Sequence, residues 1–265
     1  MTTVTENTCT DRIYEEITSA VKSDAKQNGL LTLLQFMENQ LNTAPASSAA
    51  RYHHAYSGGL VAHIWETYNI AMGLVDGLID SNLAYTNSDN HMNTSFFIGD
   101  EEFEMLHCLD RESVLTVSIL HDIHKVMDAQ DLPQYEANIL KSGAVSDKIP
   151  YKVNKDCFAY KCLSSHVDDI AEHDVDAPLR SLAWLFQNNM LELKNGGVRS
   201  LALLAARAPS LLPELTPYEI DAVRYHGGAY ETSKFELAGN ENPLTILFHC
   251  ADMLSSRFGA TRQQQ

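Results

Sequence analysis

Apolar residues recur mostly every three or four positions along this chain, and few segments alternate with a period of two. Spacing of that kind collects apolar side chains on one side of a helix, so it predicts helices rather than strands. The pattern predicts helices over residues 12–26, 30–41, 60–78, 112–126 and 243–257, with weaker signals over 155–172, 178–191 and 198–206. We therefore expect an all-α fold.

Glycine, proline and small polar residues mark where these helices should end. Gly29 is expected to separate the first two helices, and the small polar residues of segment 43–50 predict a loop. Residues 216–219, Thr-Pro-Tyr-Glu, form a capping box with proline at the first helical position, which predicts a helix start. Segment 82–100 reads as a loop-like excursion from the core, and a small β-hairpin can lie there or near 143–153.

The size and charge of the chain limit what it can do. Its 265 residues are 45% hydrophobic, enough for one sizeable core or at most two small ones. With 19 basic and 35 acidic residues the formal net charge is −16, and so acidic a body repels nucleic-acid backbones in bulk. A small anionic substrate held by metal ions remains compatible with this charge, because a local cation reverses the field around it.

Several features indicate a cytoplasmic protein. The apolar runs are far shorter than a membrane span, and the first ten residues have neither the basic nor the apolar part of a secretory signal. The five cysteines follow no ligand spacing and read as reduced thiols. The chain also lacks the phosphate-binding loop, the dinucleotide-binding glycine motif and the nucleophile-elbow, zincin and C-x-x-C motifs, so those classes lose their support.

The most unusual feature is a carboxylate directly after an apolar run. Residues 114–120 should be buried, and His121-Asp122 follows them; Asp252 lies in a second apolar run. A buried carboxylate is costly unless it is paired or bound to a metal. Imidazole with carboxylate suits Zn, Mn, Fe, Co or Ni, and carboxylates with water suit Mg. A salt bridge from Lys125 to Asp122 is the alternative explanation.

Four elements of the chain resemble the HD-domain metal-dependent phosphohydrolases. Residues 51–63, RYHHAYSGGLVAH, are similar to the version of that superfamily that opens with H-H-x-x-x-G-G-L-x-x-H. Residues 120–125, LHDIHK, resemble its L-H-D-I-G-K, with His124 in place of the usual glycine. His226-Gly227-Gly228 resembles a later histidine-glycine element, and residues 247–254 resemble the closing helix that supplies the last aspartate. The four elements stand in the expected order.

The resemblance implies an all-α HD-domain bundle with one or two divalent metal ions at its centre. The implied shared metal ligands are His63, His121, Asp122 and Asp252. Asp122 would bridge two metals, His166 and His226 would complete a second metal site, and Lys125 would face the phosphate. Asp122, Lys125, His166 and His226 are therefore the implied catalytic residues.

Three further residues are expected to bind substrate: Arg51 as a cation for phosphate, and His124 and Tyr225 near the base. Of the adjacent pair His53 and His54, one ring must point away from any shared site.

These observations predict a domain order and a function. Residues 1–50 are expected to form N-terminal helices packed on the core, residues 51–258 the HD phosphohydrolase domain, and residues 259–265 a polar tail. The expected activity is hydrolysis of a phosphoester or phosphoanhydride of a nucleotide, a (deoxy)nucleoside mono- or triphosphate. The alternatives are a phosphodiesterase or 3′-exonuclease acting on nucleic acid or a cyclic nucleotide, and a non-catalytic nucleotide-binding HD fold. The expected partner is a small nucleotide, not nucleic acid or a membrane, and a homo-oligomer is left open.

Overall fold

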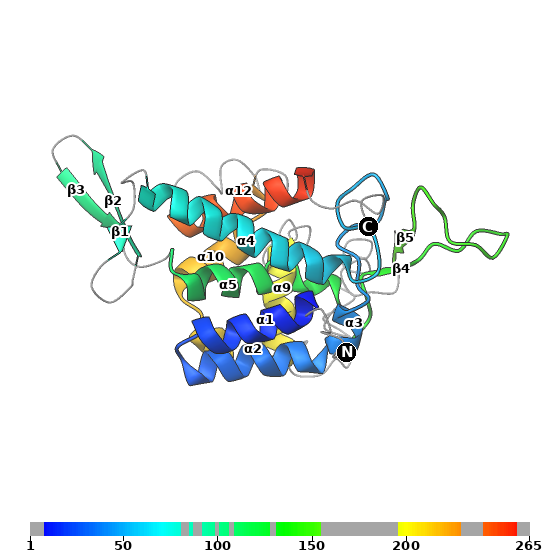
Figure 1. Ribbon diagram of the computed structural model, residues 1–265. Coiled ribbons are helices and arrows are strands. Elements are labelled where there is room, and N and C mark those ends of the chain that lie inside the picture. Colours follow the sequence, from blue (N-terminus) through cyan, green and yellow to red (C-terminus); the bar gives the residue numbers. More distant parts are fainter. Residues whose placement is uncertain are drawn as a thin grey trace, which may run out of the picture.

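The computed structural model describes residues 8–80, 109–127, 131–154, 196–228 and 241–258, and the backbone of strands at 85–86, 92–98 and 101–105. Most of this part of the chain is helical (Figure 1), so the expectation of a mainly α fold is confirmed. The helices are α1 (Cys9–Ala20), α2 (Asp24–Phe36), α3 (Glu38–Leu41), α4 (Gly59–Asp80), α5 (Arg111–Leu120), α9 (Gly196–Arg207), α10 (Pro217–Tyr225) and α12 (Pro243–Phe258), with 3₁₀ turns η1 (Ile123–Lys125) and η3 (Leu212–Glu214).

Helix α5 forms the centre of the fold. Each of its residues from Ser113 to Leu120 is buried, as expected for a helix that is covered on all sides. It lies between a layer formed by α4 and α12 and a layer formed by α1 and α2, and it also contacts α10 (Figure 1). The end of α5 is therefore enclosed by several other helices.

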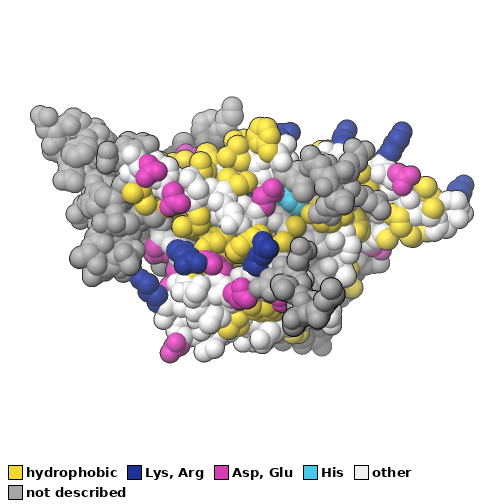
Figure 2. Space-filling view, viewed as in Figure 1, with side chains coloured by type: hydrophobic (Ala, Val, Ile, Leu, Met, Phe, Trp, Pro, Cys, Tyr) yellow, Lys and Arg dark blue, Asp and Glu magenta, His cyan; other side chains and the backbone are white. Residues whose placement is uncertain are grey.

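Short antiparallel strands occur in both segments where the sequence allows a hairpin. Strands β1 (Tyr85–Thr86), β2 (Met92–Ile98) and β3 (Glu101–Met105) pair in that order. Strands β4 (Tyr135–Ala137) and β5 (Tyr151–Val153) pair with Glu136 opposite Lys152. The loop between β4 and β5 extends from the body with apolar side chains on its surface (Figure 2).

The predicted helix break at Gly29 is wrong. Helix α1 ends at Ala20, and α2 begins after Ser23, whose hydroxyl accepts a hydrogen bond from the Lys26 backbone N–H. Gly29 lies inside α2, where an added Cβ would meet Leu211 Cδ1 at 3.0 Å. This glycine therefore serves close packing, and the cap at Ser23 marks the true helix boundary.

Most of the other predicted helix limits agree with the structure. Helices α4, α9 and α12 match the predicted ranges within two residues, and Thr216 and Glu219 form both hydrogen bonds of the predicted capping box. The predicted helices at 155–172 and 178–191 and the polar tail lie outside the described residues. None of the helices in the described ranges combines the length and the apolar character needed to cross a bilayer.

The N-terminal helices pack directly on the central layer. Helix α1 contacts α4 and α5. The buried Lys26 ammonium lies 2.6 Å from Glu219 Oε1 of α10 and 3.1 Å from Glu112 Oε1 of α5. A domain boundary at residue 50 stays a prediction.

Candidate metal centre

Five predicted site residues from four helices meet at one place. His63 lies on α4 and Asp252 on α12. His121 and His226 are the C-cap residues of α5 and α10, and Asp122 follows His121. The predicted helix 112–126 is interrupted here, because α5 stops at Leu120 and a 3₁₀ turn begins after Asp122. The interruption places the His-Asp pair at the end of the buried central helix.

The ligand atoms are close together. His63 Nε2 lies 3.3 Å from His121 Nε2, 3.1 Å from Asp252 Oδ1 and 3.5 Å from Asp122 Oδ2. His226 Nε2 lies 3.9 Å from Asp122 Oδ1. The imidazoles of His63 and His121 are fully buried, whereas the Asp252 side chain is 21% exposed. The group is thus enclosed on the helix side and open on one side.

Hydrogen bonds behind the rings decide which nitrogen faces inward. His121 Nδ1 donates to the Ser118 carbonyl at 2.8 Å, and His226 Nδ1 donates to the Val223 carbonyl at 2.8 Å. His63 Nδ1 lies 2.9 Å from the Ser255 hydroxyl. Each Nε2 therefore points toward the carboxylates, in the arrangement by which proteins orient histidine ligands of metals.

This convergence requires a positive charge. Two neutral Nε2 lone pairs at 3.3 Å, beside two carboxylates, repel one another unless a proton or a metal ion lies among them. Burial lowers the pKa of His121 to about 4, which keeps this ring neutral at pH 7. Burial also lowers the pKa of His63, but its hydrogen bonds to Asp122 and Asp252 raise it above the ordinary value overall.

The carboxylates are held in their charged form. Burial raises the pKa of Asp122, but the Lys125 ammonium and the neighbouring imidazoles lower it well below the usual range overall. Burial also raises the pKa of Asp252, but the hydrogen bond from His63 and the charges of the neighbouring imidazoles lower this pKa below its usual range overall. Charged carboxylates together with imidazole nitrogens could hold a divalent metal ion, since this mixed donor set suits such ions.

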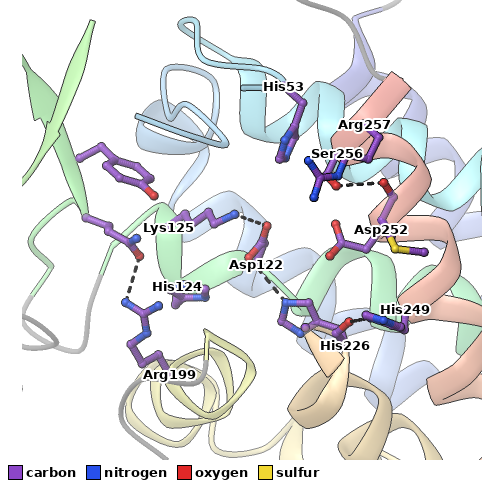
Figure 3. A pocket seen from close by; sticks show the side chains of 14 residues that line it. His53, Asp122, His124, Lys125, Arg199, His226, His249, Asp252, Ser256 and Arg257 are labelled. Carbon is purple, nitrogen blue, oxygen red and sulfur yellow. Dashed lines mark hydrogen bonds and ion pairs between the residues drawn. The ribbon is translucent and has the colours of Figure 1, made fainter. Parts of the chain in front are cut away.

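A cavity of about 360 Å³ opens beside this group (Figure 3). The carboxylates of Asp122 and Asp252 face each other across it. Its volume falls in the range of about 300–1,000 Å³ that is typical of small-ligand sites. Predicted residues on its wall are Asp122, His124, Lys125, His226 and Asp252. The arrangement therefore joins a candidate metal centre to space for a ligand.

Lys125 and His124 both lie on this wall, but Lys125 is charged and His124 is neutral. The Lys125 ammonium forms an ion pair with Asp122. That pair is the alternative explanation that the sequence offers for Asp122, and here it coexists with the histidine cluster. His124 Nδ1 lies 3.0 Å from the Ser200 hydroxyl, which donates to the His121 carbonyl, so His124 donates to Ser200. Burial holds the pKa of His124 well below its usual range.

Arg51 and Tyr225 are not among the described residues that line the cavity. Arg51 is exposed and its guanidinium donates to the Tyr52 hydroxyl at 2.9 Å. Tyr225 is buried, with the Arg224 guanidinium 5.0 Å from its ring centre. Their predicted substrate contacts therefore gain no geometric support. His166 lies outside the described residues, so its place in a second metal site stays a prediction.

Sequence reasoning missed several residues around the centre. Arg199 and Arg257 bring two further cations to the cavity wall, and no local pattern in the sequence singles them out. Ser255 follows Asp252 by three residues on the same helix face, so its spacing is a signal that could have found it. The expectation that one ring of the pair His53 and His54 points away from a shared site is wrong, because ligand atoms of both rings and of His63 lie within 4.8 Å of one another. His53 also lines the cavity, and His54 Nε2 lies 3.2 Å from Glu66 Oε2.

Comparison with known proteins adds no assignment. No protein-family model matches the chain, and no curated protein or solved structure shows significant similarity to it. The interpretation of the site therefore depends on its own geometry.

We expect the purified protein to contain at least one divalent metal ion per chain, because the buried nitrogen and oxygen atoms described above require a positive charge between them. Elemental analysis of extensively dialysed protein measures this content. Chelator treatment should remove the metal and lower the thermal midpoint of unfolding, since a ligand that binds the folded state stabilises it. Metal-free protein with an unchanged midpoint in chelator would contradict this prediction.

Proposed function

We propose that the protein is a metal-dependent phosphohydrolase with an HD-type helical bundle, and that it acts on a small nucleotide. The observation that carries the proposal is the meeting of His63, His121, Asp122 and Asp252 from three different helices. These residues are the H…HD…D set implied by the sequence resemblance. Their proximity supports the resemblance independently of the motif spacing.

The chain's own residues have distinct tasks in this reaction. A metal ion held by this set would lower the pKa of a bound water from about 15.7 toward 7 and polarise a phosphoryl oxygen. His121 accepts no proton near neutral pH, since burial lowers its pKa to about 4, and it stays available as a nitrogen donor. Burial lowers the pKa of Lys125, but Asp122 raises it overall, so Lys125 stays charged and can bind phosphate.

The charges on the cavity wall support an anionic substrate. The chain as a whole carries −16, yet Lys125, Arg199 and Arg257 all line this cavity. Arg199 contacts Gln134 Oε1 at 3.4 Å, and within the described ranges neither Arg199 nor Arg257 forms a salt bridge with a carboxylate. Cations without a carboxylate partner create a local positive potential that attracts phosphate.

A side-by-side hydrolysis assay tests the proposed substrate class. Its panel contains nucleoside mono- and triphosphates, cyclic nucleotides and short single strands, each with Mg²⁺, Mn²⁺, Co²⁺ or Zn²⁺ at two ionic strengths. We expect kcat/KM for a mononucleotide to exceed that for the strands, with a shallow salt dependence, because an acidic surface repels additional backbone phosphates. A preference for strands that weakens steeply with salt would instead favour the exonuclease alternative.

Replacing either cavity arginine should weaken substrate binding. We expect Arg199→Met and Arg257→Met each to raise KM about tenfold, since a hydrogen bond to a charged group contributes about 1.5–3 kcal/mol. Because neither side chain has a hydrogen bond or salt bridge to the proposed ligands that the structure describes, metal content should stay at the wild-type level. Steady-state kinetics and elemental analysis measure the two effects. The control is Arg12→Met, which removes an exposed guanidinium from α1; equal KM in all four proteins would remove the arginines from the site.

A further inference from the structure

A chain of hydrogen bonds extends from the metal centre to the loop that precedes α4. His63 Nδ1 lies 2.9 Å from Ser255 Oγ, and Ser255 Oγ donates to Glu66 Oε2 at 2.8 Å. His54 Nε2 lies 3.2 Å from the same Glu66 oxygen. A serine hydroxyl has one proton, and Ser255 donates it to Glu66. Toward His63 the hydroxyl can therefore only accept, so His63 Nδ1–H is the donor. The direction of each bond is thereby fixed.

We infer that Ser255 and Glu66 are positioning residues that orient His63 as a metal ligand, with His54 as the fixed end of the same chain. This inference rests on the proposed metal-dependent function. With its Nδ1 proton committed to Ser255, the ring presents Nε2 toward Asp122 and Asp252. The Glu66 charge, transmitted through the hydroxyl, increases the basicity of that nitrogen.

The two helices support each other's ligands. On α4, Glu66 follows His63 by three residues, and on α12, Ser255 follows Asp252 by three residues. Residues at this spacing share one face of a helix. Each helix therefore carries one proposed ligand and one supporting side chain. Thr67 also approaches His63 Nδ1, but its hydroxyl is more distant at 3.4 Å.

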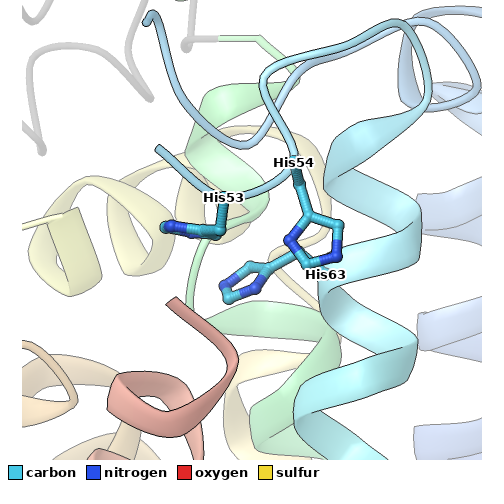
Figure 4. A group of neighbouring side chains, drawn as sticks. All are labelled: His53, His54 and His63. Carbon is cyan, nitrogen blue, oxygen red and sulfur yellow. The ribbon is translucent and has the colours of Figure 1, made fainter. Parts of the chain in front are cut away.

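The glycine pair of the opening motif holds the far end of this chain. An added Cβ on Gly59 would lie 2.0 Å from the His54 carbonyl oxygen, so only glycine permits this close approach. Gly58 has φ +78, in the left-handed region that glycine adopts without strain. The turn presents His54 to Glu66, and the rings of His53 and His54 both lie beside the His63 ring (Figure 4). In this arrangement His54 supports the site and His53 faces the cavity.

Metal affinity is the direct readout of this support. Substitutions in the outer shell of a metal site typically weaken binding by about 10–100-fold. We expect Ser255→Ala to weaken Co²⁺ binding by about that range, because His63 Nδ1–H loses its acceptor and the ring can rotate. Glu66→Gln should have a smaller effect in the same direction, because the amide oxygen still accepts both hydrogen bonds and only the charge is lost.

Titration of the metal-free full chain with Co²⁺, followed by visible absorption, tests the inference without an activity assay. Nitrogen-15 NMR of the Zn²⁺-loaded protein reports which nitrogen of His63 carries the proton, and Ser255→Ala should reduce the Nδ1–H form. The control is Thr116→Val, which removes a buried hydroxyl of α5 that forms no hydrogen bond within the described part of the chain. We expect Co²⁺ binding by this variant at the wild-type level. Circular dichroism checks the fold of each variant, and Glu66→Gln, at a partly exposed position, provides the test should Ser255→Ala not fold.

The possible outcomes separate the two proposals. Wild-type protein that binds no Co²⁺ would overturn the metal site and this support together. Wild-type protein that binds Co²⁺, with Ser255→Ala and Glu66→Gln binding it equally tightly, would overturn the support alone. Weaker binding by both variants, with the Thr116→Val control unchanged, would establish it even where the nucleotide assays fail.

Discussion

Asp122→Asn should abolish hydrolysis and strongly weaken metal binding. Asp122 Oδ2 lies 3.5 Å from both His63 Nε2 and His121 Nε2, and Oδ1 faces His226. A metal ion held among these imidazoles would therefore also contact this carboxylate. The amide keeps the size of the side chain but removes its negative charge. We expect a loss larger than the about 100-fold that outer-shell substitutions produce, since a direct ligand is removed.

The measurements are kcat/KM on the nucleotide with the highest rate and the Co²⁺ dissociation constant, both on protein whose fold has been checked by circular dichroism. Asp76→Asn is the matched control, because Asp76 is exposed on α4 and the change removes one negative charge away from the site. This variant should keep the wild-type rate and affinity. Hydrolysis by Asp122→Asn at the wild-type rate would show that the motif has been assigned to the wrong chemistry.

The sequence predicts helices well where a long periodic pattern coincides with a clear terminus. Helix α4 begins at the predicted Gly-Gly turn, and α10 begins at the predicted capping box. The prediction fails at Gly29, because a glycine inside a helix and a glycine after one look alike until its neighbour Leu211 is known. The sequence also predicts that one helix continues through His121 to residue 126, because local periodicity does not reveal that α5 ends at Leu120.

The site is predictable to the extent that its chemistry is unusual in the local sequence. Asp122 and Asp252 stand out because carboxylates seldom follow or interrupt apolar runs. Ser255 and Glu66 do not, because each is an ordinary helix residue until α4 and α12 pack together. Arg199 becomes a cavity residue only through the packing of α9 beside η1. Tertiary contacts of this kind cannot be derived from spacing within one segment.

The largest loss of stability should come from a residue outside the metal centre. Lys26 is 3% exposed and Glu219 is fully buried, with the ammonium 2.6 Å from the carboxylate. Lys26→Met leaves the Glu219 charge without this partner in the interior. Removing one member of a buried ion pair typically costs about 3–5 kcal/mol in the free energy of unfolding. Denaturant-induced unfolding, followed by circular dichroism, measures the difference.

A second variant distinguishes the unpaired charge from lost packing. Glu219 Oε2 accepts a hydrogen bond from the Thr216 backbone N–H, which caps α10, and Gln at this position keeps an oxygen for that bond. The double variant Lys26→Met with Glu219→Gln should therefore be more stable than Lys26→Met alone, because the fully buried Glu219 charge is removed together with its partner. The exposed Lys22→Met is the control and should change the free energy of unfolding by no more than about 0.5 kcal/mol. If Lys26→Met is as stable as this control, this ion pair does not hold the N-terminal helices to α10.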